Sequence, residues 1–236
     1  MIYAEILAGG KGTRLGNKDL PKQFLMLGSK PVIIHTIEQF IINPKIDKVI
    51  VCTPKESINY TNELIKKYLP GVNVDVVAGG KTRNDSIMNG CKHIEKVYGL
   101  NDDDYVITHD AVRPFINQRI INDNIKYVKK GYAVDTAIPA TDTIIQLKDN
   151  ELIDSVPERK YLYYGQTPQS FNIKELINLY DSLTEQEKSI LTDACKIYVL
   201  KNKDVKVVLG ETFNIKITTS FDLEMAEAIL KVRNND

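Results

Sequence analysis

A chain of 236 residues is long enough to bury a substantial core as one domain. Lysine plus arginine and aspartate plus glutamate each total 31, so the net charge is zero and no large basic field attracts nucleic acid. No stretch approaches the ~18 apolar residues of a membrane span, and the three scattered cysteines are typical of reduced thiols. We therefore expect a cytoplasmic protein with no nucleic-acid and no membrane partner.

Apolar runs of strand length alternate with amphipathic runs of helix length over the first 138 residues. This alternation predicts an α/β fold, with a mostly parallel sheet and helices on both faces. In such sheets ligands lie beyond the carboxyl ends of the strands. The expected strands are Tyr3–Leu7, Lys48–Thr53, Val72–Ala78, Tyr105–His109 and Ala133–Ile138, and the expected helices are Val32–Ile41, Ser57–Tyr68, Thr82–Val97 and Gln118–Lys130.

The pattern changes after Pro139, where two short strands, Thr143–Leu147 and Leu152–Val156, flank a turn at residues 148–151. This predicts a hairpin that projects from the body, with residues 139–162 as an arm of a single domain covering 1–236. A two-stranded hairpin is barely stable alone, so the arm is expected to pack against something, such as a second subunit.

The last third of the chain is expected to return mainly to helices. Thr184 and Glu187 have the spacing of a capping box. The expected elements are a helix at Asp193–Leu200, strands at Val205–Leu209 and Asn214–Ile217, and a helix at about Phe221–Val232.

The first strand runs into a glycine-rich turn, Leu7-Ala8-Gly9-Gly10-Lys11-Gly12-Thr13-Arg14. Glycine removes side chains that keep a ligand from the backbone, so the N–H groups of the turn are available to an anion or a base edge. Arg14 and Lys22 add charge where phosphates would lie. The spacing departs from the dinucleotide-binding fingerprint and from the Walker pattern, and we exclude both.

Other candidate residues follow later strands. Asp110 comes directly after an apolar strand, where a carboxylate is a natural Mg²⁺ ligand or the cap of the next turn. A second glycine turn, residues 79–86, opens a helix and either binds a base or ribose or simply caps that helix. Arg159 and Lys216 are candidate phosphate ligands, although on residue type alone either is an ordinary surface cation.

Six short motifs, taken together and in this order, resemble the sugar-alcohol phosphate cytidylyltransferases. The resemblance runs from residue 2 to about residue 230. The motifs are Leu7-Ala8-Gly9-Gly10-x-Gly-x-Arg14, Pro21-Lys22-Gln23, Gly80-x-x-Arg83-x-x-Ser86, His109-Asp110-Ala111-x-Arg113-Pro114, Thr167-Pro168-Gln169 and Asn214-Ile215-Lys216.

The resemblance implies a Rossmann-like nucleotidyltransferase body that binds CTP and Mg²⁺, and an arm that mediates homodimerisation. It implies catalytic roles for Arg14, Lys22, Arg159 and Lys216, and a metal-ligand role for Asp110. Nucleotide contacts are implied for Leu7, Ala8, Gly9, Gly10, Lys11, Gly12, Thr13, Gly79, Gly80, Arg83, Asn84, Ser86 and Ala111. Contacts with the second substrate are implied for Asp110, Arg113, Thr143, Arg159, Thr192 and Lys216.

Within this family, three segments resemble the enzymes that use ribitol 5-phosphate more than those that use methylerythritol phosphate. One of them is Thr192-Asp193-Ala194, where the methylerythritol-phosphate enzymes usually have an acidic residue in place of Ala194. The resemblance thus implies formation of CDP-ribitol for ribitol-phosphate wall polymers, with a reductase that makes ribitol 5-phosphate as an open partner. The alternatives are a methylerythritol-phosphate cytidylyltransferase and a non-catalytic nucleotide-binding module.

Overall fold

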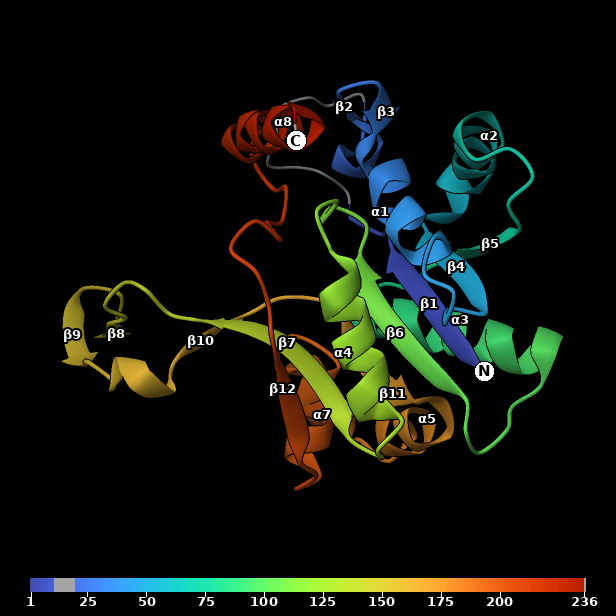
Figure 1. Cartoon of the computed structure of the whole chain (residues 1–236). Coiled ribbons are helices and arrows are strands. Elements are labelled where there is room, and N and C mark those ends of the chain that lie inside the picture. The colour runs from blue at the N-terminus through green and yellow to red at the C-terminus, as the bar shows by residue number, and fades with distance from the viewer. Residues whose placement is uncertain (11–19, 236) are drawn as a thin grey trace.

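The computed structural model describes residues 1–10 and 20–235 (Figure 1). Its strands are β1 (Ile2–Leu7), β2 (Met26–Leu27), β3 (Lys30–Pro31), β4 (Lys48–Thr53), β5 (Val74–Ala78), β6 (Tyr105–Asp110), β7 (Ala133–Pro139), β8 (Gln146–Lys148), β9 (Leu152–Ser155), β10 (Tyr163–Gly165), β11 (Gln169–Asn172) and β12 (Val205–Leu209). Its α-helices are α1 (Val32–Ile41), α2 (Ile58–Tyr68), α3 (Arg83–Tyr98), α4 (Gln118–Val128), α5 (Ile173–Asp181), α6 (Glu185–Ser189), α7 (Cys195–Leu200) and α8 (Ser220–Asn235). None of the helices described is both long enough and apolar enough to cross a membrane.

The central sheet has eight strands, and most of its pairs are parallel. β1 lies between β6 and β4 and is parallel to both, β4 is parallel to β5, and β7 is parallel to β12. β10 and β11 are antiparallel to the strands they contact. The predicted α/β fold with a mostly parallel sheet is confirmed.

Helices cover both faces of this sheet, and alternate residues of each strand supply the two cores. One core joins β1 residues such as Ala4 and Ile6 to α1, α2 and α4. The other joins Tyr3 of β1 and Val106 of β6 to α3, α5 and α7. Because both faces are buried, these strands have continuous apolar sequences, and this is why they were predictable.

The arm stands away from the sheet in Figure 1, with β8 and β9 at its far end. Asp149 and Asn150 have φ values of 53° and 61°, the left-handed conformation of a type I′ turn, and the Glu151 N–H donates to the Lys148 carbonyl at 3.2 Å across this turn. The predicted hairpin is present, although its first strand begins at Gln146 rather than at Thr143.

The predicted strand at Asn214–Ile217 is wrong. This segment is irregular, and the loop after β6 satisfies its backbone groups: Arg113 donates to the Asn214 carbonyl at 2.8 Å, and the Ile217 N–H donates to the Val112 carbonyl at 2.9 Å. Sequence analysis also missed β10, β11 and α5. The four residues of β11 are mostly polar, so their pattern does not reveal that they are buried between β6 and β7.

Candidate active site

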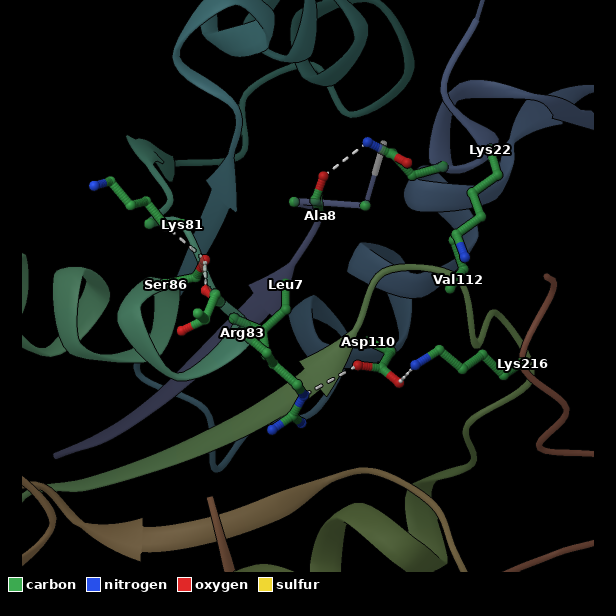
Figure 2. A pocket seen from close by; sticks show the side chains of 14 residues that line it. Leu7, Ala8, Lys22, Lys81, Arg83, Ser86, Asp110, Val112 and Lys216 are labelled. Atoms are coloured by element: carbon green, nitrogen blue, oxygen red, sulfur yellow. Dashed lines mark hydrogen bonds and ion pairs between the residues drawn. The ribbon is translucent and has the colours of Figure 1, made fainter. Parts of the chain in front are cut away.

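A pocket of about 240 Å³ lies at the carboxyl ends of β1 and β6. Two glycine turns form part of its wall, and charged side chains from distant parts of the chain line it (Figure 2). The lining residues are Leu7, Ala8, Gly9, Gly10, Lys22, Gln23, Gly80, Lys81, Thr82, Arg83, Ser86, Asp110, Val112 and Lys216. The sequence-based prediction of a site beyond the strand ends therefore agrees with the position of this pocket.

The first glycine turn is held open by backbone and side-chain contacts. The Ala8 N–H donates to the Cys52 carbonyl at 2.8 Å, and Gln23 Nε2 donates to the Ala8 carbonyl at 2.7 Å. A Cβ at Gly10 would lie 3.3 Å from Cε of Lys22, so the absence of a side chain lets the lysine pack over the backbone. Lys11, Gly12, Thr13 and Arg14 lie outside the described residues.

The second glycine turn is both a capped helix start and a wall of the pocket. Thr82 and Asp85 form a capping box at the start of α3. The Gly80 N–H donates to Ser86 Oγ at 3.0 Å, and the Ser86 hydroxyl donates to the Thr82 carbonyl at 2.9 Å. Ser86 therefore shapes the turn through its hydroxyl, and a Cβ at Gly80 would collide with Asp85.

Asp110 is the negative centre of the pocket, and three cations surround it. Lys216 Nζ lies 2.9 Å from Oδ2, and Arg83 Nε lies 3.6 Å from Oδ1 (Figure 2). Arg113 Nε lies 3.4 Å from Oδ2. Burial by itself would raise the pKa of the Asp110 carboxyl, but these cations outweigh burial and hold that pKa well below its ordinary value.

Two residues predicted to contact ligands lie behind the pocket wall instead. Arg113 is buried and binds Asp110 and the Asn214 carbonyl, so it anchors the segment that carries Lys216. Ala111 is fully buried, and its carbonyl accepts a hydrogen bond from Thr36 at 2.8 Å. Neither residue lines the pocket, and their contacts with ligands stay a prediction.

Other predicted residues do not line the pocket. Arg159 and Thr143 are exposed on the arm, where Arg159 donates to the Thr141 carbonyl at 2.9 Å. Thr192 is exposed just before α7. Asn84 bonds weakly to the Asp193 carbonyl, at 3.5 Å, rather than lining the cavity, and Gly79 packs against Ser86.

Sequence analysis gave no individual role to Gln23, Lys81, Thr82 or Val112, which all line the pocket, although the first three lie within segments that it singled out. Each is next to a selected residue, so the signal was proximity in the chain. Residue type did not reveal three of them, because a glutamine, a threonine and a valine carry no charge that indicates phosphate binding.

Glu5 of β1 is fully buried against Gly90 of α3. Cys52 Sγ donates to its Oε1 at 3.0 Å, and Oε2 has no hydrogen-bond partner among the described residues. Burial raises the pKa of Glu5 to about 8, although Cys52 and the charge of Arg83 oppose the shift. Gly90 of α3 makes room, because a Cβ there would collide with Oε1.

This buried carboxyl predicts a pH dependence of stability. Because the pKa of Glu5 is raised in the folded state, the folded protein keeps this proton at pH values where the unfolded chain has lost it. The contribution of the protonated carboxyl to folding stability is therefore fully present below the unfolded pKa of about 4.5 and is lost as pH rises toward 8. We expect the unfolding free energy to fall by a few kcal/mol across this window, and Glu5→Gln to remove most of that slope. Urea denaturation of both proteins at pH 5.5, 7 and 8 measures it. If the unfolding free energies of the wild type and of Glu5→Gln changed equally with pH, Glu5 would be ionised in the folded state.

Comparison with known proteins gives the family. The family model for 2-C-methyl-D-erythritol 4-phosphate cytidylyltransferase matches residues 2–232. This chain belongs to the 2-C-methyl-D-erythritol 4-phosphate cytidylyltransferase family. The cytidylyltransferase family predicted from the short motifs is thereby confirmed.

Relatives within this cytidylyltransferase family cover nearly the whole chain. A protein of Lactiplantibacillus plantarum named ribitol-5-phosphate cytidylyltransferase is 51% identical over 99% of this chain and 100% of its own length. The solved 4-diphosphocytidyl-2C-methyl-D-erythritol synthase of Anaerococcus prevotii is 30% identical, with a TM-score of 0.80 over 98% of this chain and 96% of that one. The 2-C-methyl-D-erythritol 4-phosphate cytidylyltransferase of Francisella tularensis is 29% identical, with a TM-score of 0.79 over 96% and 98%.

Proposed function

We propose that this protein transfers the cytidylyl group of CTP to D-ribitol 5-phosphate, forming CDP-ribitol and pyrophosphate. The convergence of Lys22, Arg83 and Lys216 on one pocket between two glycine turns carries the proposal. The relative that is 51% identical over 99% of the chain supports ribitol 5-phosphate as the second substrate.

The chemistry matches the residues that line the pocket. The substrate phosphate attacks the α-phosphorus of CTP, the bond to the β-phosphate oxygen breaks, and pyrophosphate leaves with the negative charge. A phosphate monoester has a second pKa of about 6, so at neutral pH it is already largely dianionic and needs no general base. The site must therefore position two anions and neutralise their charge.

Lys22 and Arg14 are proposed to stabilise the triphosphate and the charge that develops on pyrophosphate. Lys216 is proposed to bind the α-phosphate or the incoming phosphate, because its ammonium group already lies beside the Asp110 carboxylate in the pocket wall. The backbones of residues 7–10 and 79–86 are proposed to hold cytosine and ribose.

Mg²⁺ is proposed as the cofactor, with Asp110 as its protein ligand. No cluster of three or more histidine, cysteine, aspartate or glutamate side chains suited to a metal occurs among the described residues. A single carboxylate such as that of Asp110 fits Mg²⁺, which is usually bound through one or two carboxylates together with substrate phosphates and water. The low pKa of Asp110 keeps this ligand ionised. When bound, the ion would neutralise phosphate charge.

The arm, residues 139–162, is proposed to form the homodimer interface of a single-domain chain. A second subunit would bury the exposed apolar side chains of the arm and that of Tyr163, which follows it. These side chains are Ile145, Leu147, Leu152, Ile153, Val156, Tyr161 and Tyr163. In a symmetric dimer the arm would carry Arg159 and Thr143 to the substrate side of the neighbouring pocket, with Thr192 contributing from the body.

Arg159→Ala should raise the KM for ribitol 5-phosphate by about tenfold or more, with little change for CTP, because a charge-assisted contact to the substrate phosphate is lost. Steady-state kinetics with each substrate varied measures both values. Lys160→Ala is the matched control, since Lys160 is an exposed cation on the same short 3₁₀ turn, Arg159–Tyr161.

Mixing Arg159→Ala and Lys22→Ala chains tests whether the pocket is shared between subunits. One site of each heterodimer then carries neither defect and the other carries both, so part of the activity should return. If activity stays absent after subunit exchange has been demonstrated, Arg159 acts within its own chain.

Pyrophosphate release with CTP, Mg²⁺ and either ribitol 5-phosphate or 2-C-methyl-D-erythritol 4-phosphate tests the function itself. We expect turnover with ribitol 5-phosphate and little with the second compound. The reverse preference would assign the chain to isoprenoid precursor synthesis, and CTP binding with no turnover on either would indicate a non-catalytic nucleotide-binding protein.

The cellular setting follows from the proposed reaction. CDP-ribitol would supply teichoic acid or related ribitol-phosphate polymers of the cell wall, and CTP is a cytoplasmic nucleotide. We propose a cytoplasmic enzyme whose second substrate comes from a reductase that forms ribitol 5-phosphate. Co-purification of such a reductase with the tagged enzyme would identify it as a physical partner.

A further inference from the structure

Behind Arg83, a chain of hydrogen bonds leads away from the pocket to β7. Arg83 Nη1 donates to Gln169 Oε1 at 3.1 Å, and Gln169 Nε2 donates to Asp135 Oδ1 at 3.0 Å. Gln169 is only 2% exposed, so its amide is shielded from water. Arg83 is the member of this chain that lines the pocket.

The chemical types of these three side chains allow only one arrangement of the amide. A carboxylate accepts hydrogen bonds and a guanidinium only donates them. Asp135 therefore requires the NH₂ group of Gln169 on its side, and this leaves Oε1 facing Arg83. A flipped amide would place an NH₂ group against the guanidinium and a carbonyl oxygen against the carboxylate, so both contacts would be lost.

Arg83 depends on this arrangement because it is held at two points. Its Nε faces Asp110 at 3.6 Å, which is a long contact, and its Nη1 is held by Gln169 at the normal distance of 3.1 Å. In Figure 2 the Arg83 side chain extends from α3 toward Asp110. Losing the Gln169 contact would leave the guanidinium with only the weaker anchor.

Asp135 is itself fixed and ionised at neutral pH. Its Oδ1 also accepts the Thr136 N–H at 2.9 Å, and this orients the carboxyl group. Burial raises the pKa of Asp135 to about 6, although the Gln169 hydrogen bond opposes the rise. At pH 8 the group is a carboxylate, so it acts only as an acceptor.

We propose that Asp135 is a positioning residue for the nucleotide site: it fixes the amide of Gln169 and thereby holds Arg83 where it meets CTP. The inference rests on the proposed function only in taking CTP as the ligand of Arg83. Asp135 does not line the pocket, so it acts through the two side chains in between.

Asp135→Leu should raise the Kd for CTP about tenfold at pH 8, measured by calorimetry without the second substrate. Asp135→Asn should stay within about threefold of the wild type, since its amide oxygen still accepts from Gln169 and from the Thr136 N–H. If Asp135→Leu fails to fold, Gln169→Met interrupts the same contacts and should give the same loss.

A double variant separates positioning from packing. A carboxylate at position 169 would present an acceptor to Arg83 in either orientation, so Gln169→Glu should restore CTP binding to Asp135→Leu. In the presence of Asp135 the same change places two carboxylates together and should weaken binding. A role in packing alone predicts additive losses instead.

The proposal is overturned by any of three results in folded variants: an unchanged Kd in Asp135→Leu, an equal loss in Asp135→Asn, or no recovery in the double variant. An equal loss in Asp135→Asn would mean that the charge of Asp135, and not the amide orientation, acts on Arg83. Because binding of CTP alone is measured, absence of turnover with ribitol 5-phosphate would refute the proposed reaction and leave this test intact.

Discussion

Lys22→Ala should lower kcat by about 10²-fold or more, because it removes a preorganised cation from the position where charge develops on the leaving group. Lys22 lines the pocket beside Gly10, and its side chain extends toward Val112 (Figure 2). The expected loss in kcat exceeds the change in the Kd for CTP, since the interaction strengthens as pyrophosphate departs.

Single-turnover kinetics and CTP calorimetry on the same protein separate the two effects. Lys203→Ala is a suitable control, because Lys203 is a half-exposed lysine paired with Glu175 and lines a different cavity. Near-normal turnover in folded Lys22→Ala would remove this lysine from the mechanism. Arg14, which lies outside the described residues, is expected to behave like Lys22.

Asp110→Asn should lower Mg²⁺-dependent turnover by about 10²-fold or more, because a hard cation requires the charge that the amide lacks. The structure adds a second expectation. Arg113 is buried and would lose its carboxylate partner, so unfolding free energy should fall by about 1–3 kcal/mol. Kinetics over a Mg²⁺ titration and urea denaturation measure the two effects.

The matched control is Asp102→Asn, which removes an exposed carboxylate paired with Lys174. Loss of stability together with an unaltered Mg²⁺ dependence in Asp110→Asn would make Asp110 a structural ion-pair partner only. The pKa of Asp110 lies below its ordinary value, so its contribution to stability is present above the unfolded pKa and lost as pH falls through the folded pKa.

The local parts of the site were predictable because they are encoded by neighbouring residues. Gly9 and Gly10 come directly after the apolar run of β1, and Gly80 comes shortly before α3. In both places a strand is followed by residues without side chains, a pattern that indicates close approach of a ligand to the backbone. The structure places all three glycines in the wall of the same pocket.

The less predictable parts depend on contacts between distant residues. Lys216 was expected in a strand, but it lies on an irregular segment that Arg113 holds against Asp110. Gln169 was selected as part of a motif, yet its role between Arg83 and Asp135 depends on β11 lying between β6 and β7. No local pattern reports which strands become neighbours.

By itself, the sequence determined the α/β class, the order of the alternating elements in the first half of the chain, the hairpin and the two glycine turns. Hydrophobic period and turn chemistry are local properties of the chain, so they can be interpreted without its partners. Only the tertiary structure decided that Arg83 and Lys216 meet at the Asp110 carboxylate, and that Arg113 and Ala111 lie behind the pocket wall. The order of strands in the sheet sets those distances, and that order results from packing over the whole molecule.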